Sequence, residues 1–407
     1  DIKSFQLQTR PFHWAQFKSI SLKPGHRTDV QVVVEGNTGG AQPPQETSPS
    51  YAELLKLYPD AKLGMPTAEE KKELGELWPD VPAEENAAFY FIKAGAMIRG
   101  EDAPPESLCS GEKSTEFDPA RLRSWVKSKQ GALNLLQKGL QKKTCQVPFF
   151  MRTTRLRVDQ GLHFSMGMAN LGRLACDKGL AAEMDGRPEE AALWYLACIR
   201  LWNRLFRSGS YAPSQMGQAV MTEGRVHLER LVENADLSRT VLATALEQCG
   251  VLEIENRDIR EVLSRETSLA TRMNPVHQNS SSVSSAEKFV DEITEIIREW
   301  ACTNALIRMT RIRIAISLYR RRTGNGPPPN LDALTPDPLE SVPVDPFSGG
   351  PLKYARTDTG WKVWSVGPDG VDQGGKGNIP YTRNSEDLVT RSQLASNREE
   401  RTKKGTK

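Results

Sequence analysis

Apolar residues recur every three to four positions over most of the chain between residues 51 and 273, a spacing that predicts amphipathic helices. One run follows the segment Pro82-Ala83-Glu84-Glu85-Asn86, which indicates the start of a helix. A second follows Asp118 and Pro119, which together mark a helix start, and it continues to Leu140 as one predicted helix. We therefore predict a helical domain over residues 51–273.

The clearest helical hairpin is predicted from about Arg155 to Phe206 and is broken at Asp185-Gly186-Arg187-Pro188. Small and aromatic residues in its second helix are similar to the pattern of a tetratricopeptide hairpin. The first helix is too long for that repeat, and no second copy follows at a fixed period. An array of irregular helical hairpins is the better interpretation.

A second long helical pattern runs over 286–322 and ends abruptly at the Gly/Pro-rich segment 324–329. The next apolar runs, 352–355 and 361–366, alternate with the period of a strand and are separated by a turn at 358–360. These patterns predict a β-hairpin that packs against the long helix. The fold class expected for the whole chain is mainly α, with an irregular helical-hairpin domain and a small α+β C-terminal domain.

Composition shifts divide the chain into five predicted parts. Gln31-Val32-Val33-Val34 is a candidate strand within an otherwise extended start, and five serines in the six residues after Asn279 indicate a linker. The parts are an extended N-terminal segment and linker over 1–50, the helical domain over 51–273, a Ser-rich linker over 274–285, the long helix plus β-hairpin module over 286–390, and a disordered basic tail over 391–407.

The net charge and the distribution of apolar residues limit the classes of partner that we expect for the protein. The 407 residues carry a net charge of +3, from 54 basic and 51 acidic side chains. This balance gives no electrostatic argument for binding nucleic acid. No run approaches the roughly 18 to 20 apolar residues of a membrane-spanning helix. The chain begins with Asp1 rather than Met, and we expect a removed N-terminal anchor to be its one link to the membrane.

Several motifs follow the long helix in a fixed order. They are Pro343-x-Asp345-Pro346, then Tyr354, then Ser365-Val366-Gly367-Pro368-Asp369-Gly370. Over roughly residues 300 to 375 this order resembles the soluble domain of the type II secretion major pseudopilin. The resemblance implies an extracytoplasmic location and a calcium-holding loop. The chain departs from the family at 287–299, which is charged where pseudopilins are apolar, and at Lys376-Gly377-Asn378, which replaces further acidic residues.

The chain as a whole resembles a group of envelope proteins of planctomycete-type bacteria. The residues that carry this likeness are Glu85-Asn86-Ala87-Ala88, Cys145-Gln146-Val147-Pro148 and the segment from Asp345-Pro346-Phe347 to Asp369-Gly370. This likeness implies no activity.

Candidate chemistry is sparse. Asp369 and Asp372, with backbone carbonyls of the loop, are the candidate ligands of a calcium ion, and a turn without metal is the alternative. The segment 370–376 has the glycine and lysine spacing of a phosphate-binding loop, but Gly377 stands where Ser or Thr is needed. His163-Phe164-Ser165-Met166-Gly167 resembles a nucleophile elbow but falls inside a helical pattern.

Six cysteines show no Cys-x-x-Cys spacing, which argues against zinc and thioredoxin-type chemistry. Cys176, Cys198 and Cys302 lie in apolar helical patterns and are expected to be buried. Cys109 and Cys145 lie in loop-like sequence, where either a disulfide or two free thiols would fit.

These observations favour a non-catalytic extracytoplasmic scaffold or interaction protein, located in the periplasm or cell envelope and membrane-tethered in its full-length form. The first alternative is a peptide- or protein-binding adaptor that uses a tetratricopeptide-like helical groove. The second is an envelope enzyme with a dispersed site. Protein partners are expected, nucleic acid is not, and calcium is the one candidate cofactor.

Overall fold

The computed structural model of the chain contains two compact units, Asp1–Ser48 and Pro49–Lys407, which are described separately. The residues that the structure describes are 4–9, 13–18, 31–35, 49–64, 67–74, 79–98, 118–148, 151, 158–207, 211–253, 260, 263–264, 283–324, 326–358, 360–377 and 387–389.

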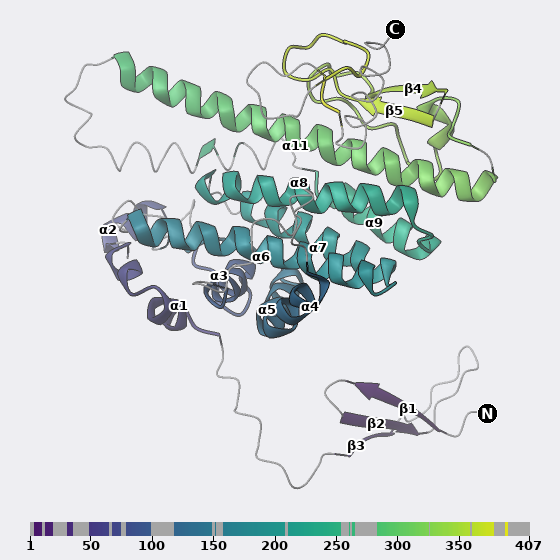
Figure 1. The fold of residues 1–407 in the computed structure, drawn as a ribbon. Helices are drawn as coiled ribbons and strands as arrows, with labels where there is room; N and C mark the ends of the chain where they lie inside the picture. Colours follow the sequence, from purple (N-terminus) through teal and green to yellow (C-terminus); the bar gives the residue numbers. More distant parts are fainter. Residues whose placement is uncertain are drawn as a thin grey trace. The chain divides into compact units, whose positions relative to one another are not determined.

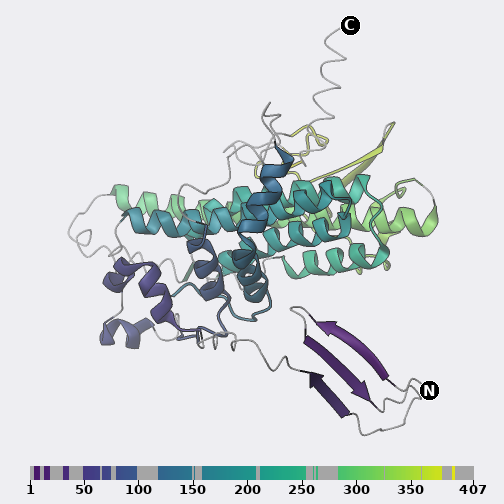
Figure 2. The ribbon, with the colours of Figure 1, turned by 60° about the horizontal axis from the view of Figure 1, so that its bottom comes forward.

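The first unit is a three-stranded antiparallel sheet in the order β1-β2-β3, visible in Figure 2. Its strands are β1 (Ser4–Thr9), β2 (His13–Lys18) and β3 (Gln31–Glu35). The strand expected at 31–34 is therefore confirmed. The segment before it, which was expected to be extended only, contains two further strands of the same sheet. The sequence Ser-Phe-Gln-Leu-Gln-Thr of β1 alternates apolar and polar residues, as expected for a strand.

The second unit is mainly helical, as predicted, and contains one small two-stranded antiparallel sheet among its described residues. The helices are α1 (Tyr51–Leu57), η1 (Pro59–Gly64), α2 (Ala68–Leu74), α3 (Ala87–Ala96), α4 (Pro119–Ser128), α5 (Gln130–Leu140), α6 (Val158–Met184), α7 (Pro188–Arg207), α8 (Tyr211–Asn234), α9 (Arg239–Val251), α11 (Val283–Thr323) and η4 (Leu331–Leu334). The strands are β4 (Lys353–Thr357) and β5 (Gly360–Trp364).

The predicted helix starts are confirmed by their capping hydrogen bonds. The Asn86 side chain accepts from the Ala88 backbone N–H at 3.1 Å, and that of Asp118 accepts from Ala120 at 2.8 Å. Each bond satisfies a backbone donor that the first turn of a helix leaves without an internal partner.

The single helix predicted from Asp118 to Leu140 is wrong. The chain breaks at Lys129, whose backbone leaves the helical region, and forms α4 and α5. The break lets α4 pack on α6 while α5 packs on α3, so the two halves bury different apolar faces. Tertiary packing therefore overrides a helical pattern that is continuous in the sequence.

The predicted hairpin is confirmed as α6 and α7, and the turn between them passes through Gly186 at φ +71°. This left-handed conformation favours glycine. Two further glycines let α3 and α6 approach closely, because a Cβ at Gly95 would lie 2.9 Å from the backbone of Gly167. The long α6 is thus held by α7 on one side and by α3 on another.

Three apolar clusters follow one another through the unit. The first core joins α1, α3, α4, α5, α6 and α7, and the second core joins α7, α8, α9 and α11. The third core joins α11 to η4 and the β4–β5 hairpin. Figure 1 shows α11 between the helices α8 and α9 on one side and the hairpin on the other.

The β-hairpin forms as predicted and packs against α11. Tyr354 pairs with Val363 in its register, and Val363 is buried in the third core with Ile312 and Ile316 of α11. Further likeness to a pseudopilin domain stays a prediction.

The helical segment and the C-terminal segment, predicted as two domains, share the second core and belong to one compact unit. Of the predicted linker 274–285, residues 283–285 are already part of α11, and 274–282 lie outside the described residues. The predicted tail 391–407 also lies outside them.

Candidate functional site

The Pro-x-Asp-Pro motif is organised by the carboxylate of Asp345, which is fully buried. Its Oδ1 accepts from the Ser365 hydroxyl at 2.9 Å and from the Phe347 N–H at 3.0 Å. Its Oδ2 accepts from the Val366 N–H at 2.9 Å. Three donors compensate for the desolvation of one buried charge, so Asp345 joins the two motif segments structurally.

The two predicted calcium ligands lie in the following loop, and each is occupied by hydrogen bonds within the protein. Asp369 accepts from Val371 N–H at 3.0 Å and from the Gln373 side chain at 2.7 Å. Asp372 accepts from the Trp364 indole and the Gly374 N–H, both at 2.9 Å. These bonds lower the pKa of Asp372, the indole contributing most.

A third carboxylate, that of Asp387, holds the same loop from a distant part of the sequence. It is fully buried and accepts from the backbone N–H groups of Gln373 at 3.2 Å and Gly375 at 2.7 Å. Burial raises its pKa above the ordinary value of an aspartate. Across the described residues no group of three His, Cys, Asp or Glu side chains is arranged to hold a metal ion. The calcium site therefore stays a prediction.

The other residues that the sequence suggested for chemistry have structural positions in the protein. Residues 163–167 lie within α6, and Cys176, Cys198 and Cys302 are buried as expected. Burial raises the pKa of the Cys145 thiol to about 12, which disfavours the thiolate. Its proposed partner Cys109 lies outside the described residues, so the disulfide stays a prediction.

An ionic cluster is buried between α8 and α11. Arg225 and Glu229 are each 2% exposed and bond at 2.6 Å, and the Thr310 hydroxyl donates to the same Glu229 oxygen at 2.6 Å. Arg313 of α11 lies 3.9 Å from the second Glu229 oxygen and also pairs with Glu233. This cluster fixes the two helices in one relative position, and its residues line neither of the two pockets described below.

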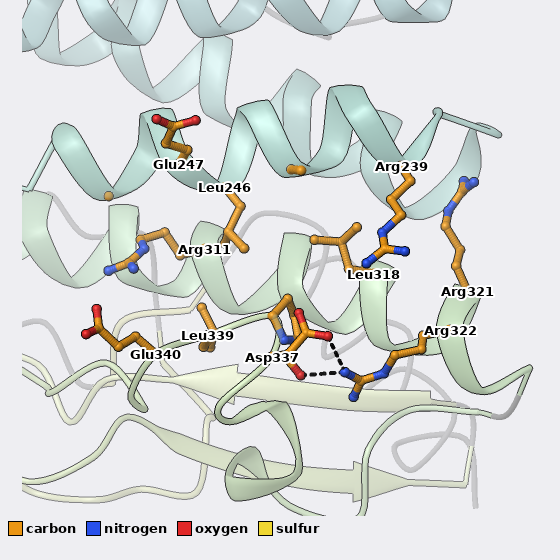
Figure 3. Close-up of a pocket in the computed structure, with 13 residues that line it drawn as sticks. Arg239, Leu246, Glu247, Arg311, Leu318, Arg321, Arg322, Asp337, Leu339 and Glu340 are labelled. Carbon is orange, nitrogen blue, oxygen red and sulfur yellow. Dashed lines mark hydrogen bonds and ion pairs between the residues drawn. The ribbon is translucent and has the colours of Figure 1, made fainter. Parts of the chain in front are cut away.

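A pocket of about 780 Å³ opens between α9, α11 and the loop 337–340, and we call it the α9–α11 pocket. Figure 3 shows three leucines, Leu246, Leu318 and Leu339, in the middle of its lining. Leu318 belongs to the second core and Leu339 to the third, so the floor of the pocket lies where these two cores meet.

Charged side chains of opposite sign stand at the two ends of the pocket. Arg239, Arg321 and Arg322 occupy one end, and Glu247 and Glu340 occupy the other. Two of the arginines are neutralised, because Arg321 pairs with Asp236 at 2.9 Å and Arg322 with Asp337 at 2.6 Å.

Three charged side chains at the α9–α11 pocket lack a partner of opposite charge in the part of the chain that the structure describes. Within the described part of the chain Arg239, Glu247 and Glu340 have no hydrogen bond or ion pair from their side chains. Arg311, which also lines the pocket, pairs with Glu253. As far as the described residues go, the result is a floor of leucines with an unpaired cation at one end and two unpaired carboxylates at the other.

A second pocket of about 470 Å³ lies between α5, α7 and α9. Its charged side chains are already used by the protein. Glu190 pairs with Lys178 at 3.0 Å, and Arg200 donates to the Leu140 carbonyl at 2.9 Å. Glu190 and Arg200, the charged side chains of this pocket, therefore both have partners within the protein.

Sequence reasoning did not select the residues of the α9–α11 pocket. Arg239 and Glu247 lie eight positions apart on α9, so a helical wheel could have placed them at the two ends of one stripe. The loop 337–340 could not be placed in this way, because its position depends on how the chain folds back along α11.

Comparison of the chain with protein-family models, with curated proteins and with solved structures finds no match. Among the helices described, none combines the length and apolar character needed to cross a membrane.

Proposed function

We propose that the protein is a non-catalytic scaffold or interaction protein whose α9–α11 pocket binds a segment of a protein partner. The observation that carries the proposal is the floor of leucines between ends of opposite charge. Apolar surface flanked by a few convergent polar groups is the usual composition of a binding site. The side chains of Arg239, Glu247 and Glu340, which have no partner among the described residues, supply those polar groups.

The geometry of the α9–α11 pocket supports a binding role because its walls come from elements that are well anchored. Arg308 of α11 bonds to Glu253 at 2.9 Å and to the Val344 carbonyl at 2.7 Å. Arg207 of α7 donates to the Glu253 carbonyl at 2.8 Å. A pocket with fixed walls loses little conformational entropy when a partner binds.

We further propose an extracytoplasmic location, with a membrane tether in the full-length protein. The support is the order of motifs from Asp345 to Gly370 and the β-hairpin that packs on α11, both of which the pseudopilin resemblance implies. Calcium at Asp369 and Asp372 belongs to the same proposal.

The alternative is an adaptor that binds peptides along its helical hairpins. The pocket between α5, α7 and α9 favours this alternative, because all of its lining lies within residues 51–273. Leu193, which is 47% exposed, is an apolar side chain at its surface.

Selection from a displayed random peptide library distinguishes the two sites. Ala243→Trp fills the α9–α11 pocket, Leu193→Trp fills the other pocket, and Ala120→Trp adds the same side chain to an exposed position in neither. We expect enriched peptides to lose binding to the Ala243→Trp variant alone. Loss in the Leu193→Trp variant alone would favour the adaptor, and equal binding to all three variants would contradict both proposals.

A further inference from the structure

The charges of the α9–α11 pocket define a class of partner more narrowly than the proposed function does. We infer that the pocket binds an extended peptide that carries an acidic and a basic residue four positions apart with an apolar residue midway between them. The inference rests on the proposed function and concerns the same pocket.

The apolar residue is required by the floor of the pocket. Leu339 is 1% exposed and Leu318 is 9% exposed, while Leu246 is half-buried and packs against both the second and third cores. An apolar side chain placed over this floor would remove from water its own surface and the part of Leu246 that is still exposed.

The acidic residue is required by Arg239. This guanidinium points into the pocket beside the Arg322–Asp337 pair in Figure 3, and it is the one arginine of that end without a carboxylate among the described residues. A guanidinium matches a carboxylate with two parallel hydrogen bonds, which are stronger and more directional than those of neutral groups.

The basic residue is required by the opposite end. Among the described residues Glu247 and Glu340 have no cation as a partner, and the neighbouring Arg311 is paired with Glu253. A peptide with two acidic residues would therefore meet repulsion at this end, so the pocket selects against uniformly acidic partners.

The spacing follows from the geometry of α9. Arg239 and Glu247 are eight residues apart, which is about 12 Å along a helix that rises 1.5 Å per residue. An extended chain rises about 3.3 Å per residue, so about four residues span the same length. Side chains at positions one, three and five of an extended peptide share a face, which turns the acidic, apolar and basic groups toward the pocket together.

The probe is a fluorescein-labelled peptide, Glu-Thr-Leu-Thr-Lys, with the reversed order Lys-Thr-Leu-Thr-Glu as a second probe. Binding to the full chain is measured by fluorescence anisotropy. We expect one of the two orders to bind and Arg239→Glu to weaken it by about 10- to 100-fold. Arg121→Glu makes the same charge change at an exposed position on α4 and should leave the affinity unchanged.

A charge swap distinguishes direct pairing of the peptide with residue 239 from a general effect of the net charge of the protein. The bound probe with Lys in place of Glu should bind Arg239→Glu at least tenfold more tightly than it binds the unaltered protein. Equal affinity of Arg239→Glu and the unaltered protein for every probe would overturn the inference. If library peptides then still lose binding to Ala243→Trp, the proposed function stands while the inference fails. If no peptide loses binding to Ala243→Trp, both fail.

Discussion

The carboxylate of Asp345 joins two stretches of chain that lie 20 residues apart. Its three donors come from a hydroxyl and two backbone N–H groups, so both carboxylate oxygens are satisfied without a cation. Local hydrogen bonding therefore gives this aspartate of the pseudopilin-like motif a structural role. The aspartate is needed because it offers two acceptor oxygens in a short side chain.

Asp345→Asn should lower the free energy of unfolding by about 2 to 4 kcal/mol. The amide nitrogen replaces one acceptor oxygen with a donor that faces an N–H or hydroxyl donor, and the charge that strengthened the remaining bonds is lost. Urea denaturation followed by circular dichroism measures the change. Asp358→Asn makes the same change at an exposed carboxylate without a partner in the described chain and should alter stability by less than about 0.5 kcal/mol. Similar effects of both variants would contradict the role assigned to Asp345.

Asp372 predicts a dependence of stability on pH. Its pKa is lowered in the folded protein, chiefly by the Trp364 indole. The stabilisation is therefore fully present above the pKa of the unfolded chain, near 3.9, and is lost as the pH falls through the lower folded value. The difference in melting temperature between the unaltered protein and Asp372→Asn should be constant above pH 5 and shrink below about pH 4. In a Trp364→Phe background this pH-dependent part should be smaller, and no change there would contradict the assigned cause.

Among the elements, α8 and α11 depend on a buried ionic cluster as well as on apolar packing. Arg313 connects three elements, because it faces Glu229 of α8 and its guanidinium lies 4.8 Å from the centre of the Trp361 ring of β5. Charges with so little exposure are costly unless each has a partner. The cluster therefore specifies which faces of the two helices meet.

Glu229→Gln should lower the free energy of unfolding by about 3 to 5 kcal/mol, because it leaves Arg225 as a buried cation without its carboxylate. The double variant Arg225→Met with Glu229→Leu should recover most of this loss, since an apolar pair has no charge to compensate. Urea denaturation checks both. Glu247→Gln is the matched control at an exposed position on α9. If the single and double variants are equally unstable, packing rather than charge is the cause.

Prediction from sequence succeeded where the signal was local and failed where it was distant. Asn86, Asp118 and Gly186 marked helix ends correctly, because capping and left-handed turns depend on neighbouring residues. The break at Lys129 was missed because Val126 and Leu133, on either side of it, keep the spacing of one continuous helix. The pairing of Glu229 with Thr310 joins positions 81 residues apart, and no periodicity in either helix indicates it. The α9–α11 pocket combines three such distant segments and was missed for the same reason.

At the scale of the molecule, α11 joins the helical layers to the C-terminal hairpin. Its residues Ile307 and Ile314 face the second core, while Ile312 and Ile316 face the third. A helix with apolar residues on two sides must be covered on both to be stable in water. The two predicted domains are therefore expected to depend on each other.

Cleavage of the chain between the two predicted domains tests whether they depend on each other. A protease site inserted within residues 274–282 would be cut after purification, and we expect the two pieces to elute together in size-exclusion chromatography. The shared second core is the reason, because separation would expose the side chains that α11 buries against α8 and α9. Elution as two separate, folded pieces would show that the halves are independent. Ala305→Asp places a charge in the third core, between α11 and the hairpin, and should unfold the hairpin alone. This variant is compared with the cleaved protein.

The late position of α11 has a consequence for how the chain is made. Helix α8 ends at Asn234, and α11 is complete at Thr323. At about 5 to 20 residues per second, a ribosome needs roughly 5 to 20 s to synthesise the intervening 90 or so residues. During that interval the nascent α8 and α9 present apolar surface, together with the buried side chains of Arg225 and Glu229, before their covering helix exists. A general holdase should therefore bind nascent chains that stop before residue 283 more than chains that extend beyond residue 360.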